Sequence, residues 1–299
     1  MIDIQEVSNN VYMLKIPVPI NVEAVNLYLF DGEIPTLLDT GTNTPEVIEA
    51  VHEGMKKVGI KRLEQVLVSH WHVDHSGAAN TFAQEGAKVF IGSRDYQEWT
   101  SFVHGEAFSS LNQWATQEWG VPEMEIPGML KIYKRLQYLT ALPDQVALIE
   151  PEQTVMAGDN LLRAIPTPGH TAGHLSFYNE KDSLLFSGDM LLPDEIPYPG
   201  IWEEEGHVVS GMPSYLESLN SIEALQTKMY LPGHGLPSEN LIARCQEIRE
   251  KLYHQKTKHR PAESVYLSAS NGNQKIHPGV LFIQLHYIYG WEQLKSRIG

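Results

Sequence analysis

The 299-residue sequence contains a single cysteine, Cys245. One cysteine cannot form an internal disulfide, and its isolation excludes both a redox pair and a zinc site built from several thiolates. We expect Cys245 to be a helix residue without a function of its own. No apolar run reaches the length of a transmembrane helix, and residues 1–6 lack the basic and then apolar pattern of a secretory signal. These absences predict a soluble, cytoplasmic protein.

Basic residues are also scarce, with 22 Lys and Arg against 37 Asp and Glu and a net charge of −15. Residues 241–299 hold nine basic residues and four Glu, or +5, which leaves −20 for residues 1–240. An acidic body repels polyanions, whereas enzymes of nucleic acids need cationic groups to neutralise phosphates. We therefore expect a small-molecule substrate rather than nucleic acid. The basic run 251–260 could contact nucleic acid, but a solvated helix end is the simpler interpretation.

Short apolar runs alternate with helical patterns, which predicts an α/β fold. A chain of this length and 42% hydrophobic content can bury a large core. We expect strands at residues 10–16, 25–30, 36–38, 63–68, 88–91, 145–149, 160–165, 174–178, 183–186 and 229–231, and helices at 44–57, 78–85 and 213–226.

A cluster of potential metal ligands follows the strand expected at 63–68. It contains His70, His72, Asp74 and His75, three imidazoles and a carboxylate in six consecutive residues. These ligand types suit zinc, manganese or iron, and a turn after a strand can direct all four toward one point. Any one of these histidines could lie in a metal-free surface loop, but three histidines and an aspartate together on a strand-to-helix turn predict a metal site.

Three later segments share one plan, in which a short apolar strand leads to a glycine-containing turn and then to His or Asp. They present His170, Asp189 and His234 at expected strand ends. Taken alone, each could be an ordinary turn. In open α/β sheets, however, ligand sites lie at the carboxyl ends of strands, where the first cluster also lies.

The chain resembles the metallo-β-lactamase superfamily, whose His-x-His-x-Asp-His motif is followed by a His, a bridging Asp and a final His. The resemblance covers about residues 10–240 and implies a four-layer αββα sandwich with metals at one edge. It implies that His70, His72 and His170 hold one metal, that Asp74, His75 and His234 hold another, and that Asp189 bridges the two. The family also implies that Asp39 accepts a hydrogen bond from a ligand imidazole; a turn cap is the alternative.

The chemistry expected from such a site is hydrolysis. Two divalent ions, zinc first and manganese or iron as alternatives, would share a bridging hydroxide at neutral pH. No serine or cysteine nucleophile is then required, and the sequence has no Gly-x-Ser-x-Gly elbow. The resemblance further suggests that Asp74 acts as a catalytic acid or base, although a purely ligating role explains this residue equally well.

Departures from the patterns of known branches narrow the function. The flavodiiron branch carries Glu at the position of His72, and true β-lactamases use a cysteine ligand or lack the bridging Asp. Acyl-homoserine lactonases carry a Tyr where this chain has Leu192. The pattern is most similar to the glyoxalase II-like group, but the tail does not match the glutathione-binding domain of authentic glyoxalase II.

Residues 94–145 interrupt the alternation with a predicted helical insertion, which could fold over the site as an apolar lid or be a structural subdomain. We expect the chain to divide into a catalytic domain at residues 1–240, which includes this insertion, and a helical tail at residues 241–299. The protein could also form a homodimer. The insertion is rich in aromatic residues, namely Tyr96, Trp99, Phe102, Phe108, Trp114, Trp119, Tyr133 and Tyr138.

The favoured function is a two-metal hydrolase of an ester, thioester or lactone with an apolar acyl part. The alternatives from the same superfamily are a phosphodiesterase or endoribonuclease and a mononuclear-iron persulfide dioxygenase. A non-catalytic binding module is less favoured, because degenerate members generally lose ligands and all seven positions are kept here.

Overall fold

The computed structural model describes residues 2–20, 22, 24–106, 126–204 and 207–258. Its first sheet has seven strands in the order of the chain: β1 (Asp3–Ser8), β2 (Val11–Ile16), β3 (Val25–Phe30), β4 (Thr36–Leu38), β5 (Gln65–Leu67), β6 (Lys88–Gly92) and β7 (Ala147–Ile149). Strands β1 to β4 pair antiparallel, and β4 to β7 pair parallel. The parallel half needs helical crossovers, which accounts for the alternation in the sequence.

The second sheet has five described strands in the order β14 (Met229–Pro232), β11 (Leu184–Gly188), β10 (Leu175–Asn179), β9 (Asn160–Pro166) and β8 (Thr154–Ala157). Only the pair of β11 and β14 is parallel, and α7 (Met212–Glu223) lies between these strands in the chain. A separate hairpin joins β12 (Ile201–Glu204) to β13 (His207–Ser210). Strands β1 and β8 and this hairpin were not predicted from the sequence.

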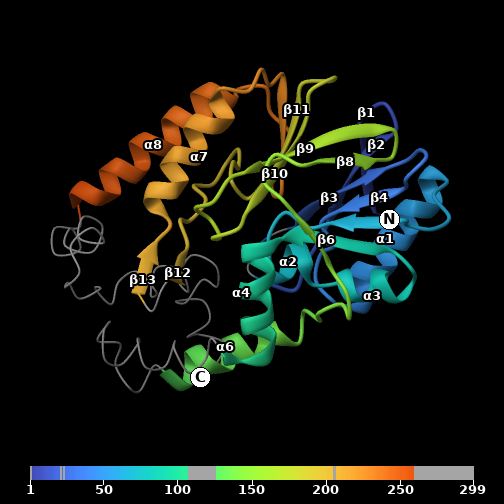
Figure 1. Cartoon of the computed structure of the whole chain (residues 1–299), viewed down its shortest axis with the longest axis horizontal. Helices are drawn as coiled ribbons and strands as arrows, with labels where there is room; N and C mark the ends of the chain where they lie inside the picture. The colour runs from blue at the N-terminus through green and yellow to red at the C-terminus, as the bar shows by residue number, and fades with distance from the viewer. Residues whose placement is uncertain (1, 21, 23, 107–125, 205–206, 259–299) are drawn as a thin grey trace.

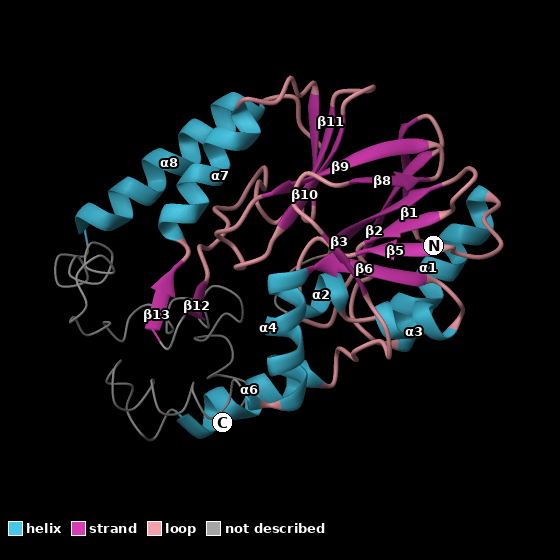
Figure 2. Ribbon diagram, in the orientation of Figure 1, coloured by secondary structure: helices cyan, strands magenta, loops and turns pink. Residues whose placement is uncertain are grey.

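Three hydrophobic clusters define four layers. The middle cluster lies between the sheets and includes Tyr28 and Phe30 of β3 against Phe186 of β11. Helices α1 (Pro45–Val58) and α3 (Ala79–Gln84) pack on the outer face of the first sheet. Helices α7 and α8 (Leu241–Lys258) pack on the second sheet, on the opposite side of the molecule (Figures 1 and 2). This is the αββα sandwich that the sequence predicts.

The described parts of the predicted insertion contain two helices, followed by turns and loops at residues 138–145. Helix α4 (Ser93–His104) follows β6, and α6 (Ile126–Gln137) precedes β7. Trp99 anchors α4, because its ring is fully buried and its Nε1 donates a 2.8 Å hydrogen bond to Oγ1 of Thr140. Phe108, Trp114 and Trp119 of the predicted aromatic set lie outside the described residues.

Helix α8 lies at the start of the predicted tail. Its residues Leu241, Cys245, Ile248 and Leu252 are buried in one cluster with α7, so this half of the helix forms part of the outer layer. Residues 259–299 lie outside the described residues, and the division of the chain at residue 240 stays a prediction. Every described helix is too short or too polar to span a bilayer.

Candidate metal centre

The first group of candidate ligands lies just beyond β5. After Leu67 the chain turns through Ser69 and His70 into the four-residue helix α2 (Val73–Ser76). His72 is the N-cap of α2, and Asp74 and His75 lie within its single turn. Buried β5 pairs with parallel strands on both sides, so the start of this turn is held by the centre of the first sheet.

The other candidate ligands come from strand ends of the second sheet. His170 follows β9, Asp189 follows β11 directly, and His234 follows β14. Strand ends of both sheets therefore meet at one edge of the sandwich. All seven side chains that the sequence predicts as ligands are brought together there.

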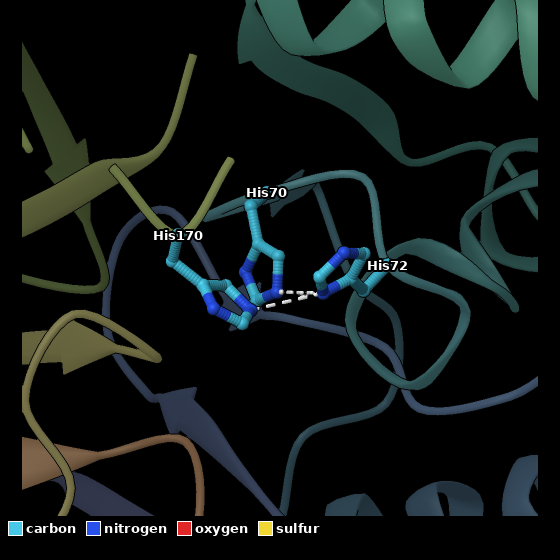
Figure 3. Close-up of side chains that lie close together, drawn as sticks. All are labelled: His70, His72 and His170. Carbon is cyan, nitrogen blue, oxygen red and sulfur yellow. Dashed lines mark hydrogen bonds between the residues drawn. The ribbon is translucent and has the colours of Figure 1, made fainter. Parts of the chain in front are cut away.

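His70, His72 and His170 form the first triad. Nδ1 of His72 lies 3.1 Å from Nε2 of His70 and 3.0 Å from Nε2 of His170. The three rings converge with these nitrogen atoms toward one another (Figure 3). Such an arrangement could hold one metal ion.

Asp74, His75 and His234 form the second triad. Nε2 of His234 lies 3.4 Å from Nε2 of His75 and 3.3 Å from Oδ2 of Asp74. Oδ2 of Asp74 is also 3.7 Å from Nε2 of His75. Two imidazoles and one carboxylate again direct single atoms toward a common point.

Asp189 lies between the triads. Its Oδ2 is 3.6 Å from Nε2 of His170 in the first triad and 3.6 Å from Nε2 of His234 in the second. Its Oδ1 is 3.4 Å from Nε2 of His75. One carboxylate thus reaches both groups.

Hydrogen bonds on the outer side of the imidazoles fix which nitrogen faces the site. Nδ1 of His170 lies 3.0 Å from the carbonyl oxygen of Tyr198, and Nδ1 of His234 lies 2.6 Å from that of Ala24. A carbonyl can only accept, so Nδ1 carries a proton and Nε2 is the atom left to bind a metal ion. His75 is held in the same way by a 2.9 Å hydrogen bond from its Nδ1 to Oδ2 of Asp39.

The charges of the two triads differ. Burial, together with the neighbouring histidines, holds the pKa of His70 well below its usual value, and burial lowers the pKa of His72 to about 3. Burial also disfavours a charged His234, but the carboxylates of Asp189 and Asp74 outweigh it and raise its pKa to about 9. The first triad therefore offers neutral imidazoles, while in the second the carboxylates retain protons on their histidine partners when no cation is bound.

The residues present fit a pair of metal ions. Ligands about 2.0–2.1 Å from a tetrahedral zinc ion lie about 3.3 Å apart, close to the separations within the triads. Oδ1 of Asp189 is buried and makes no hydrogen bond within the described part of the chain. A Cβ at Gly233 would approach that atom to 2.4 Å, so a side chain there would fill the site. An unsatisfied buried carboxylate oxygen beside imidazole lone pairs suits a cation.

Three polar residues around the site were not predicted from the sequence, of which Asp95 and His174 are buried and Glu98 is half-buried. Asp95 and Glu98 lie on α4, and His174 lies just before β10. Nδ1 of His174 lies 2.8 Å from Oγ1 of Thr167, while its Nε2 accepts a 3.2 Å hydrogen bond from the backbone of Asp189. Asp95 and Glu98 are ordinary acidic residues of a helix in the sequence, whereas the position of His174 four residues after His170 is a spacing that could have drawn attention to it.

Comparison with known proteins identifies the family. The model of the metallo-beta-lactamase superfamily matches residues 20–234, which is more than half of the chain. The chain belongs to the metallo-beta-lactamase superfamily. Together with the hydrolase names of the relatives described below, this membership identifies a metal-dependent hydrolase.

Among solved structures, the fold is similar to a metallo-beta-lactamase family protein from Thermus thermophilus. The TM-score is 0.74 at 25% identity, over 90% of this chain and 86% of that one. A beta-lactamase domain protein from Burkholderia ambifaria is also similar, with a TM-score of 0.74 and 24% identity over 87% of this chain and 77% of that one.

Two relatives carry functional names. The probable metallo-hydrolase YqjP of Bacillus subtilis is 27% identical over 82% of this chain and 76% of its own length. The atrochrysone carboxyl ACP thioesterase of Aspergillus fumigatus is 23% identical over 62% of this chain and 42% of its own length. The chain spans less than two thirds of several relatives that it matches, including 63% and 61% of two others.

Proposed function

We propose that this protein is a two-metal hydrolase of a small ester, thioester or lactone with an apolar acyl part. The observation that carries the proposal is the convergence of two ligand triads with Asp189 within reach of both. His70, His72 and His170 would hold one ion, Asp74, His75 and His234 the other, and Asp189 would contact both. Zinc is the first choice, with manganese or iron as alternatives.

Metal ions bound by these residues would supply a water acidified to a pKa of about 7 and a Lewis acid for the substrate oxygen. The chain itself would orient the donors, through the carbonyl groups of Tyr198 and Ala24 and the carboxylate of Asp39. These partners hold Nε2 of His170 toward the first triad, and Nε2 of His234 and His75 toward the second, before substrate arrives.

Asp74 is proposed to move a proton as well as to act as a ligand. Its buried carboxylate would accept a proton from the attacking water and return it to the leaving group. Asp74→Asn keeps the shape but removes the proton acceptor, so kcat should fall about 10²–10⁴-fold even when excess metal keeps both sites filled. Loss of one ion in that variant would favour a purely ligating role.

An aromatic wall supports an apolar acyl group. The ring of Trp71 packs 4.8 Å from His72 and 5.1 Å from Phe102, and Phe102 packs 4.6 Å from Tyr133 on α6. Apolar surface covered by this wall would gain about 25 cal/mol per Å². A relative named as a thioesterase supports a thioester, and the acidic body disfavours nucleic acids.

The wall can be tested by acyl-chain length. With thioesters of increasing length, kcat/KM should rise by up to about fourfold for each added methylene, the equivalent of about 0.8 kcal/mol. Tyr133→Ala should flatten this dependence. Tyr138→Ala is the matched control, because Tyr138 is 84% exposed.

The proposed reaction is tested on the full chain, stripped of metal and then loaded with zinc, manganese or iron. We expect two bound equivalents and turnover of at least one member of an ester, thioester and lactone panel. His170→Ala should abolish this turnover, whereas His52→Ala, which replaces an exposed histidine paired with Glu85, should not.

Three outcomes would overturn the proposal. Cleavage of RNA or a bis-phosphodiester, with none of the panel hydrolysed, would favour the phosphodiesterase alternative. Oxygen consumption with a persulfide and a single bound iron would favour the dioxygenase. A protein that binds no metal would overturn the proposal and would also remove the basis of both alternatives.

The other features predicted from the sequence remain part of this proposal. We propose that the insertion at residues 94–145 serves as a lid and that 241–299 is a tail to the catalytic domain at 1–240. Membership of the glyoxalase II-like group, a cytoplasmic location and a homodimer are proposals of the same standing.

A further inference from the structure

Asp95 is a fully buried carboxylate in the first turn of α4 and is not one of the proposed ligands. Its Oδ2 accepts a 2.9 Å hydrogen bond from the backbone N–H of Trp71 and a 2.8 Å hydrogen bond from Oγ1 of Thr171. Its Oδ1 accepts a 2.6 Å hydrogen bond from the backbone N–H of Gly173. One side chain therefore joins two loops that are distant in the sequence.

Both loops carry ligands of the first triad. Trp71 lies between His70 and His72, and Thr171 follows His170. The backbone on either side of these contacts bears the three imidazoles whose nitrogen atoms lie 3.0–3.1 Å apart. Two ligands of the second triad are held by other groups. Nδ1 of His75 is hydrogen-bonded to Asp39, and Nδ1 of His234 to the carbonyl oxygen of Ala24.

The packing around Asp95 leaves no room for adjustment. A Cβ at Gly173 would lie 2.5 Å from the backbone nitrogen of Asp95 and 2.7 Å from its Oδ1. A Cβ at Gly92, which precedes α4, would lie 2.9 Å from the carbonyl oxygen of Gly173. Glycine at both positions lets the loop approach the start of α4 closely. Trp99, one turn further along the same face of α4, is also fully buried and holds the helix in place.

We propose that Asp95 is a positioning residue that sets the spacing of the His70, His72 and His170 triad. It holds the turn before α2 and the loop after β9 at a fixed separation, and so arranges the three imidazoles before a metal ion binds. The inference rests on the proposed metal site and adds that one ion, but not the other, depends on this carboxylate.

The test measures metal affinity rather than turnover. Zinc is titrated into the metal-free full chain in competition with a chromophoric chelator, which resolves two equivalents in the unmodified protein. Asp95→Asn cannot accept all three hydrogen bonds, and we expect one equivalent to bind about 10–100-fold more weakly while the other changes less than about twofold. With cobalt, the visible spectrum of only one equivalent should change.

Two further variants complete the test. Glu98→Gln is the matched control on the same helix, because Glu98 accepts a 2.8 Å hydrogen bond from the indole Nε1 of Trp71, and the amide oxygen of Gln can accept the same hydrogen bond. It should leave both affinities unchanged. Thr171→Val removes one donor at similar volume, so a smaller loss confined to the same equivalent is expected even if Asp95→Asn fails to fold.

The outcomes separate this inference from the proposed function. If the unmodified protein binds neither zinc nor manganese nor iron, both are overturned. If it binds two equivalents and Asp95→Asn or Thr171→Val weakens both equally, or weakens neither, the metal site stands and the positioning role of Asp95 is overturned. A lower melting temperature with unchanged affinities would likewise assign Asp95 a purely structural role.

Discussion

The carboxylate of Asp39 holds the imidazole of His75 through a 2.9 Å hydrogen bond to Nδ1. The same carboxylate accepts hydrogen bonds from the backbone and the hydroxyl of Ser69, at 2.7 and 2.8 Å, and that hydroxyl lies 2.9 Å from Nδ1 of His70. Asp39 thus orients one candidate ligand of each triad. Its own backbone has a φ of 60°, which Asp and Asn adopt more readily than other residues with a Cβ.

Replacement of Asp39 should therefore weaken metal binding at both triads. Asp39→Asn tolerates the backbone conformation but places an amide N–H where an acceptor is needed. Zinc affinity should fall about 10–100-fold for both equivalents, the usual effect of removing a partner of a metal-ligating histidine. Titration against a chelator measures this, and a variant with unchanged affinity would show that Asp39 serves only as a turn cap.

Asp189 offers a test of the contact between the triads. Asp189→Ala removes a carboxylate within reach of both triads. Loss of a residue that only hydrogen-bonds to a metal ligand can lower activity about 100-fold, and the loss of turnover in Asp189→Ala should be larger. The side chain is small and lies at a strand end, so the far-ultraviolet circular dichroism spectrum should be retained. Undiminished turnover in a folded Asp189→Ala protein would contradict the two-metal mechanism.

Much of the site could be predicted because its residues follow a rule of position. Each of His70, His170, Asp189 and His234 follows a short apolar strand, and carboxyl ends of strands gather at one edge of an α/β fold. The convergence of these side chains could therefore be predicted from the sequence, while their role as metal ligands stays a prediction. Asp95 follows no such rule, because an acidic residue in the first turn of a helix is ordinary on a surface and only its burial reveals its contacts.

The buried ring of Trp99 predicts a large contribution to stability. Trp99→Ala should lower the free energy of unfolding by about 3–5 kcal/mol, because it leaves a cavity between α4 and the segment that contains Thr140. Trp99→Phe should cost about 1–3 kcal/mol, because the hydroxyl of Thr140 loses its donor. Urea denaturation measures both; an undiminished stability of Trp99→Phe would show that the hydrogen bond contributes nothing, whereas equal losses in the two variants would show that filling the cavity with a ring contributes nothing.

Cys245 should be unreactive in the folded protein. It is fully buried in α8, and burial raises the pKa of its thiol to about 12, so almost no thiolate exists at pH 8. A thiol reagent should modify less than one group per chain in buffer and one group after denaturation. Rapid modification of the native protein would show that α8 does not pack against α7 in solution.

The outer elements were harder to predict than the sheets. Strands such as β3 and β11 are buried at every residue and give clear apolar runs. Strand β8 has only four residues, with exposed and buried positions in alternation, and β1 is largely polar. Short and polar strands carry too little hydrophobic signal to be distinguished from loops. Their pairing with better-defined neighbours, which the sequence does not display, decides their conformation.

The candidate centre draws on both sheets, and His75 and His234 are 159 positions apart in the chain. A bound cation would thus tie together regions that ribosomes make at quite different times. A nascent polypeptide that ends before residue 234 lacks one donor of the second triad, so the complete pair of sites cannot assemble until most of the protein has been synthesised and both halves have docked. Metal binding would then be a late step in the maturation of the protein, and removal of the metal would first destabilise the contact between the two sheets at this edge.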